Sequence, residues 1–284
     1  MRAIETLLDG LIDYAGLYPP AGLDMHAAVR NYLSGQQGKY GYALGRFVVD
    51  LDRIEEFSRV AGGSADRLRV SLIVPSVPDW DRVAELLDAG LRIDSVEFRP
   101  GRVEQTAMCR KHVRSHVATY HEMPVDGSAW DFIHAIAGTG NRMKLRMGGL
   151  ASEAFPRADS VARVLSWASH CRVSFKATAG LHHPIRSRHP FTYKPGSPSG
   201  TMHGFINLFC AATLLYLGGA ATDAERALEE EKMNAWEVGS DAIGWGSMRW
   251  SAAQILEVRQ SFLNCIGSCS FEEPIRDLEA LGWL

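Results

Sequence analysis

Two lysines lie in segments that predict neighbouring β-strands, and together they suit chemistry on a carbonyl group. Segment 142–149 (RMKLRMGG) contains Lys144, and segment 174–180 (SFKATAG) contains Lys176. An amine must lose its proton before it attacks a carbonyl carbon, and a neighbouring cation together with burial lowers the pKa of a lysine toward neutral pH. Adjacent lysines therefore predict a Schiff base on one of them, with the other tuning its pKa.

Acidic residues on other predicted strands could pair with these cations. Lys144 and Arg146 are two residues apart, so both lie on the same side of their strand. Two cations inside a protein are costly to desolvate unless anions or a bound substrate meet them. Glu97 and Glu122 are the candidate partners and proton carriers. The alternative is an outward-facing strand end on which the two cations are solvated.

Further residues near strand ends could hold an anionic substrate. Arg99 shares a strand face with Glu97, and Tyr120 shares one with Glu122. Arg46 begins another predicted strand, and we favour it over the tyrosines that follow the first strand because a guanidinium can clamp a carboxylate or phosphate. With Arg146, these residues predict a small anionic substrate.

Segment 180–202 predicts a long irregular loop with histidines in and beside it. Four histidines fall within 22 residues: His182, His183, His189 and His203. A loop of this length in a compact domain is often an active-site lid. We expect His182, His183 and His203 to assist proton transfer from this loop, and Arg186 to meet the substrate when it closes.

The same histidines offer a second kind of site. Imidazole is also a common ligand of divalent metals. No His-x-x-x-His pair, Cys-x-x-Cys pair or aspartate-rich loop accompanies the histidines, so a metal would need Glu97 or Glu122 as well. We expect no cofactor. The alternative is a metal-dependent hydrolase or lyase in which the lysines only bind substrate.

Composition excludes several other classes of protein. Of 284 residues, 46% are hydrophobic and 22% are charged, which is typical of a globular chain. Thirty basic against 33 acidic residues give a net charge of −3, so we expect no nucleic-acid partner. No stretch approaches the roughly 20 apolar residues of a membrane span, and residues 1–17 do not form a signal peptide. We therefore expect a cytoplasmic protein with no membrane partner.

The five cysteines are odd in number and scattered, which fits a reducing compartment better than a disulfide framework. We interpret Cys265 and Cys269 as packing residues and leave open a labile thiol at either. The apolar segment 205–217 could be a contact between subunits of a homo-oligomer or a core helix.

Apolar runs that alternate with amphipathic segments predict the scaffold for these residues. Repeated βα units with eight strands predict one α/β domain over residues 1–284, a TIM-like (β/α)8 barrel with a lid-like loop at 180–202. A doubly wound open parallel sheet is the alternative. The predicted strands are 11–17, 45–49, 69–74, 95–99, 116–122, 142–147, 172–178 and 241–248. The predicted helices are 24–34, 51–61, 79–89, 103–113, 128–137, 157–170, 203–217, 222–237, 251–263 and 272–284, with Asp24, Asp79 and Ser128 as N-caps.

Two family resemblances rest on these motifs. Lys144 and the segment 176–181 (KATAGL) resemble the class I deoxyribose-phosphate aldolases, in which a lysine on strand six forms the Schiff base and one on strand seven tunes it. The segment 144–149 (KLRMGG) differs from the Lys-Thr-Ser-Thr-Gly pattern of that family. The motifs KxRxGG, FKATAGLHHP and HGFxNL also resemble a bacterial family without an assigned function.

The leading hypothesis is an aldolase-like lyase acting on a small anionic carbonyl compound. The resemblance to the aldolases implies Lys144 as the nucleophile, whereas the residues alone do not choose between Lys144 and Lys176. Besides the metal-dependent enzyme, the second alternative is a barrel that binds an anion without catalysis.

Overall fold

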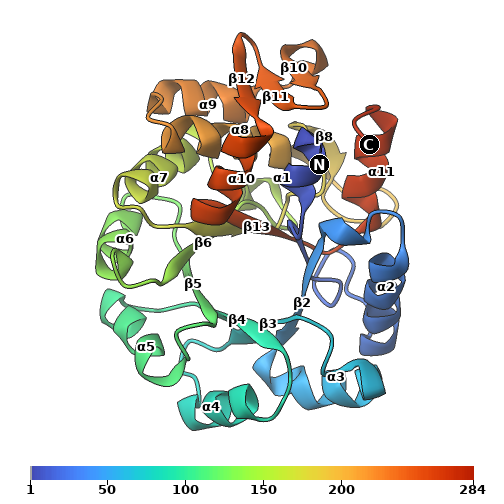
Figure 1. Ribbon diagram of the computed structural model, residues 1–284, viewed down its shortest axis with the longest axis vertical. Coiled ribbons are helices and arrows are strands. Elements are labelled where there is room, and N and C mark those ends of the chain that lie inside the picture. Colours follow the sequence, from blue (N-terminus) through green and yellow to red (C-terminus); the bar gives the residue numbers. More distant parts are fainter. Residues whose placement is uncertain (1) are drawn as a thin grey trace.

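A computed structural model describes residues 2–284, apart from the side chain of Arg110. Eight parallel strands close into a barrel in the order β1-β13-β7-β6-β5-β4-β3-β2, and helices surround it (Figure 1). The predicted (β/α)8 barrel is therefore confirmed, and the alternative of an open sheet is wrong. The barrel strands are β1 (Ile12–Tyr14), β2 (Leu44–Asp50), β3 (Val70–Val74), β4 (Ile93–Phe98), β5 (Ala118–Met123), β6 (Arg142–Arg146), β7 (Phe175–Thr178) and β13 (Leu263–Ser268).

Most helices lie close to their predicted positions, but the helix Ala3–Leu8 was not predicted, and segment 103–113 is α-helical only over Cys109–His112. The side chains of Asp24 and Asp79 cap their helices by accepting hydrogen bonds from backbone N–H groups, whereas Ser128 makes no such bond. The predicted helix 222–237 ends early, at Glu229. The helices are α1 (Ala3–Leu8), α2 (Met25–Gln37), α3 (Ile54–Ala61), α4 (Trp80–Asp88), α5 (Cys109–His112), α6 (Ala129–Ile136), α7 (Ala158–His170), α8 (Phe205–Tyr216), α9 (Ala221–Glu229), α10 (Ala252–Ser261) and α11 (Glu272–Ala280).

The eighth barrel strand is not the one predicted. Residues 241–248 contribute β11 (Ala242–Trp245), which pairs antiparallel with β10 (Trp236–Val238) and β12 (Met248–Ser251) outside the helix ring (Figure 1). Gly246, with φ of +58°, turns the chain between β11 and β12. The barrel is closed instead by β13, whose sequence LNCIGS gives a weak strand signal because Asn, Gly and Ser interrupt it.

The barrel strands bury charge inside and apolar side chains outside. Alternate residues such as Phe47, Leu145 and Phe175 belong to two apolar clusters between the strands and the helices. The interior holds buried polar groups, among them Lys144 and Lys176. Barrel interiors are usually filled by Val, Ile and Leu. The interior of this barrel instead contains paired charges, so we expect the functional site to lie there.

The segment 180–202 is more ordered than predicted. It contains an antiparallel pair, β8 (Ser187–Pro190) and β9 (Ser199–Met202), rather than an irregular loop. Phe191, which follows β8, stacks on Phe155 with the ring centroids 5.4 Å apart. Phe155 lies in the loop that follows β6, so the β8–β9 hairpin packs against that loop.

Helix α8 is a core helix in this chain. All of its residues from Phe205 to Leu215 are buried among other elements. Of the two roles left open for segment 205–217, the structure supports the core helix. No helix among residues 2–284 is long and apolar enough to cross a membrane.

A buried histidine on β5 predicts that the stability of the fold is sensitive to acid. His121 is 0% exposed, neither ring nitrogen has a hydrogen-bond partner, and burial lowers its pKa to about 4. The unfolded chain, with a histidine pKa of about 6.5, takes up this proton first. Stability is thus fully present above about pH 6.5 and is lost as the pH falls toward 4.

We therefore expect His121→Leu to flatten the pH dependence of the free energy of unfolding. Between about pH 7 and about pH 4.5, the wild type should lose about 2 kcal/mol more than the variant, as measured by urea unfolding. His116→Leu is the matched control, because His116 is exposed. Equal pH dependence in His121→Leu and the wild type would contradict a neutral ring in the folded protein.

Candidate active site

A cavity of about 550 Å³ opens at the carboxyl ends of the barrel strands. This is the end at which barrel enzymes carry their active sites. Its floor is formed by charged side chains from β4, β5, β6 and β7, and its walls by the loop after β1, the β8–β9 hairpin and α11. Among its lining residues are all six that the sequence predicts to be catalytic: Lys144, Lys176, Glu97, Glu122, His182 and His183.

One carboxylate joins the two lysines. Lys144 and Lys176 are register partners on β6 and β7, so the prediction that they lie side by side is confirmed. The Nζ of Lys144 lies 2.6 Å from Oε2 of Glu97, and the Nζ of Lys176 lies 2.6 Å from Oε1. Ser71 donates a further hydrogen bond to Oε1 at 2.7 Å. Glu97 is thereby held rigidly between the two ammonium groups.

Glu122 connects Lys144 to the mouth of the cavity. Its Oε2 lies 2.9 Å from the Nζ of Lys144, and its Oε1 accepts a hydrogen bond from Nε of Arg146 at 3.1 Å. Arg99 approaches the same Oε1 at 4.0 Å. The Arg146 side chain is 51% exposed and that of Arg99 is 73% exposed, so both retain guanidinium N–H groups for a ligand.

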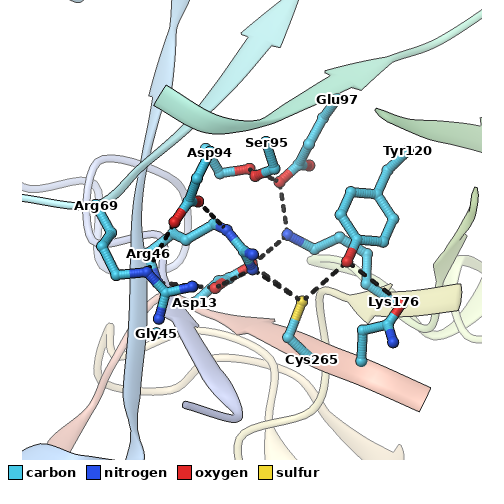
Figure 2. Close-up of polar contacts among 12 residues, drawn as sticks. Asp13, Gly45, Arg46, Arg69, Asp94, Ser95, Glu97, Tyr120, Lys176 and Cys265 are labelled. Carbon is cyan, nitrogen blue, oxygen red and sulfur yellow. Dashed lines mark hydrogen bonds and ion pairs between the residues drawn. The ribbon is translucent and has the colours of Figure 1, made fainter. Parts of the chain in front are cut away.

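The charge network continues downward from Lys176 into the barrel (Figure 2). The Nζ of Lys176 lies 2.6 Å from Oδ2 of Asp13, which also accepts a hydrogen bond from the Cys265 thiol at 3.2 Å. Asp13 pairs in turn with Nη1 of Arg46 at 3.6 Å, and Arg46 binds Asp94. The result is a continuous row of alternating charges from the amino-terminal end of the barrel to the cavity.

This alternation fixes the protonation states of its members. Burial opposes ionisation of Glu97, but the ammonium groups of both lysines outweigh it and hold the pKa of Glu97 well below its usual range. Although burial opposes this, the pKa of Asp13 is lowered by Lys176 and Arg46. The pKa of Glu122 is likewise lowered by Lys144 and Arg146. Burial would lower the pKa of Lys176, yet Asp13 and Glu97 raise it well above its usual range. The expectation that Lys176 could have a lowered pKa is therefore wrong, because carboxylates separate the lysines.

Glycines in the two lysine motifs let the loops above the lysines pack closely. A Cβ on Gly148 would lie 2.9 Å from the Cα of Gly180 and 2.5 Å from the Phe155 ring. Ala179 and Gly180 both have positive φ, 64° and 68°, and turn the chain sharply after β7. The small residues of KLRMGG and KATAG therefore keep the loops after β6 and β7 in contact.

A second polar cluster lines the opposite wall of the cavity. His182 pairs through Nδ1 with Oε2 of Glu273 on α11 at 3.0 Å, and Tyr193 donates a hydrogen bond to the same oxygen at 2.8 Å. His183 Nδ1 lies 2.6 Å from Oδ2 of Asp277, one turn farther along α11. The ring of His183 stacks on His189 of the hairpin, with the centroids 3.3 Å apart.

The predicted substrate-binding residues divide into two groups. Arg99 and Arg146 line the cavity, but the other four do not. Arg46 was favoured over the tyrosines and is a wrong prediction, because it lies near the start of β2 and is taken up by Asp13 and Asp94. Tyr120 is fully buried beneath the lysines, and its hydroxyl oxygen accepts a hydrogen bond from Nη1 of Arg142 at 3.2 Å.

The remaining two residues stabilise loops instead. The ring of His203 is bonded through Nε2 to the Pro156 carbonyl oxygen at 2.8 Å, and burial lowers its pKa to about 4. Arg186 pairs with Glu231 at 3.2 Å. Neither side chain lines the cavity, so neither is retained as a site residue.

Several cavity residues were not predicted. Asp50 ends β2 and lies beside Tyr18, and burial raises the pKa of both groups. The position of Asp50 at the carboxyl end of a predicted strand was a usable signal. Glu273 and Tyr193 gave none, because only the packing of α11 and the hairpin brings them to the cavity, and Cys269 follows β13, the strand that was not predicted.

The metal alternative gains no support from the geometry. Within residues 2–284, leaving aside the side chain of Arg110, no group of three or more His, Cys, Asp or Glu side chains could hold a metal ion. His182 and His183 face carboxylates of α11, whereas Glu97 and Glu122 face the lysines. The predicted ligands are thus divided between the floor of the cavity and the wall formed by α11.

A scan against protein-family models finds no match to this sequence, and a search of curated proteins finds none either.

Proposed function

We propose that the cavity is the active site of an aldolase-like lyase that acts on a small anionic carbonyl compound through a Schiff base on Lys144. The observation that supports this best is the position of the Lys144 amine in the cavity floor, between the carboxylates of Glu97 and Glu122. The volume of about 550 Å³ is within the range of small-molecule sites.

Lys144 suits the nucleophile better than Lys176. Lys176 is 1% exposed, and its raised pKa keeps it protonated between Asp13 and Glu97. Lys144 forms part of the cavity floor beside Glu122, and the other oxygen of this carboxylate is bonded to the half-exposed Arg146, so Glu122 links the amine to the mouth. Lys176 then serves as a fixed cation that holds Glu97 in place. The resemblance to the class I aldolases implies the same assignment.

The carboxylates favour the product of the first step. Lys144 gives a proton to Glu122, its nitrogen bonds to the carbonyl carbon, and one of the two protons left on that nitrogen moves to the carbonyl oxygen. Loss of that oxygen as water, with the proton returned by Glu122, leaves an iminium. The iminium carries its charge where the ammonium was, so Glu97 and Glu122 stabilise it without rearrangement. Glu122 then takes the proton of a hydroxyl on the second carbon from the iminium, and the bond between that carbon and the carbon next to the iminium breaks. The hydroxyl-bearing fragment leaves as a carbonyl compound, and the electron pair of the broken bond converts the iminium to an enamine.

Arg146 and Arg99 are the groups that would hold the substrate's carboxylate or phosphate. Both are at the mouth, and charge-assisted hydrogen bonds from guanidinium groups are strong and directional. An anion there lies above Lys144, since Arg146 and Lys144 share Glu122. This arrangement would direct the carbonyl group toward the floor.

Reductive trapping tests the proposal. We expect borohydride to fix a covalent adduct from at least one member of a panel of small oxo acids and phosphorylated hydroxy-aldehydes, and peptide mapping to locate it on Lys144. If compounds of the panel protect the protein against heat but leave no adduct, the cavity is a non-catalytic anion-binding site and the proposed lyase is wrong.

A further inference from the structure

A cysteine lies where the active-site cavity meets a second cavity. Cys269 directly follows β13, and the second cavity has a volume of about 500 Å³. Cys269 and Tyr193 line both cavities. The thiol is 6% exposed, so small molecules reach it through the cavities rather than from the outer surface.

Three side chains surround this sulfur. The Sγ of Cys269 lies 3.8 Å from Nδ1 and 3.9 Å from Nε2 of His182, and 3.7 Å from the Tyr193 hydroxyl. Glu273 orients both neighbours, because its Oε2 is bonded to His182 at 3.0 Å and to Tyr193 at 2.8 Å. A thiol, an imidazole and an orienting carboxylate are the components of cysteine nucleophiles.

The imidazole beside Cys269 is held in its charged form. Burial opposes protonation of His182, but hydrogen bonds to Cys269 and Glu273 raise its pKa to about 10, so an imidazolium faces the sulfur. Burial raises the thiol pKa of Cys109 to about 12 and that of Cys265 to about 11. It also raises the thiol pKa of Cys171 and Cys210.

We propose that Cys269 is a second nucleophile of the cavity, with His182 as its proton partner, and that it takes small conjugated carbonyl acids as covalent ligands. In the addition, Sγ bonds to the β-carbon of the alkene, and the alkene electron pair moves to the α-carbon. The thiol proton, carried by His182, then goes to that carbon. The product is a thioether, and no oxidant or reductant is consumed.

The cavity explains the ligand class. A thiolate is a soft nucleophile that prefers a conjugated alkene carbon. The same cavity carries Lys144 in its floor and Arg146 and Arg99 at its mouth. These cations can hold the acid group and polarise the carbonyl while the alkene faces Cys269. The proposal does not depend on a Schiff base, because a cation at position 144 is sufficient.

The test uses β-acetylacrylate, a small conjugated keto acid, with intact-mass analysis and peptide mapping of the full chain. We expect one adduct, on Cys269, that forms in the unaltered protein and in Lys144→Arg but not in Cys269→Ser. Levulinate, the saturated analogue, should give no adduct. Cys171→Ser is the matched control and should react like the wild type, since Cys171 is more exposed than Cys269 but outside the cavity.

Proton transfer by His182 gives a readout that simple exposure does not. His182→Asn should slow adduct formation by about a hundredfold at neutral pH and shift its pH profile. Mapping of the adduct to Cys171 or another cysteine would overturn the proposal, even if Cys269→Ser failed to fold. So would an unchanged rate and pH profile in His182→Asn.

Discussion

Lys144→Arg is expected to abolish the borohydride-trapped adduct, with a loss of at least about a thousandfold in its rate of formation. Arginine keeps the positive charge between Glu97 and Glu122, so the variant should remain folded. A guanidinium does not form a Schiff base under these conditions because it keeps its proton. The measurement is intact-mass analysis after reduction with whichever compound labels the wild type.

The charge-conserving change matters for this test. Lys144→Met would leave two buried carboxylates without one of their cations, and a loss of trapping could then follow from local disorder. Arg186→Lys is a suitable control, because Arg186 pairs with Glu231 away from the cavity. If Lys144→Arg still forms an adduct on Lys176, the roles of the two lysines are reversed. If the adduct forms at an unchanged rate on a lysine outside the cavity, the trapping is non-specific and the proposed Schiff-base site is wrong.

The barrel could be predicted because its helices and seven of its strands have clear periodicity. The eighth strand could not, since its inward residues are small or polar and its signal fell at the end of a predicted helix. A real antiparallel strand outside the barrel, β11, supplied the missing eighth run. The predicted number of strands was correct only because two errors cancelled: β11 was counted as a barrel strand, and β13 was missed.

The floor of the site followed from strand periodicity alone. Residues two apart on a strand share a face, which brought Lys144 and Arg146 together and placed Glu97 and Glu122 in reach. Depth along the strand was the harder quantity. Arg46 lies near the first residue of β2 and Asp50 is its last, so only Asp50 reaches the cavity at the carboxyl end of the barrel.

The wall formed by α11 was beyond prediction for a different reason. Glu273 reaches the cavity through the packing of the last helix against the barrel mouth, and Cys269 reaches it because it follows β13, the strand that the sequence did not predict. Both contact His182, which is about ninety residues away along the chain. No local pattern encodes such a contact. Likewise, the sequence showed two lysines, but not that a carboxylate separates them and raises the pKa of one.

The buried charges also make a strong prediction about stability. Lys176→Met should lower the free energy of unfolding by about 3–5 kcal/mol, because it leaves Asp13 and Glu97 buried without their shared cation. Urea unfolding near pH 7 measures this loss. Arg163→Met is the control, because its ion pair with Asp159 lies at the surface and its loss should leave the free energy of unfolding nearly unchanged.

A double variant identifies the cause of that loss. If the uncompensated charge dominates, Asp13→Asn combined with Lys176→Met should cost less than the sum of the two single changes, since each removes the partner that the other leaves behind. The loss in Lys176→Met should also shrink at acidic pH. The lowered pKa values of Asp13 and Glu97 mean that their stabilising contribution is present above about pH 4 and is lost as the pH falls. In the variant, these carboxylates can take up protons and relieve the buried charge, so a loss that is additive and independent of pH would point to packing rather than to the ion pairs.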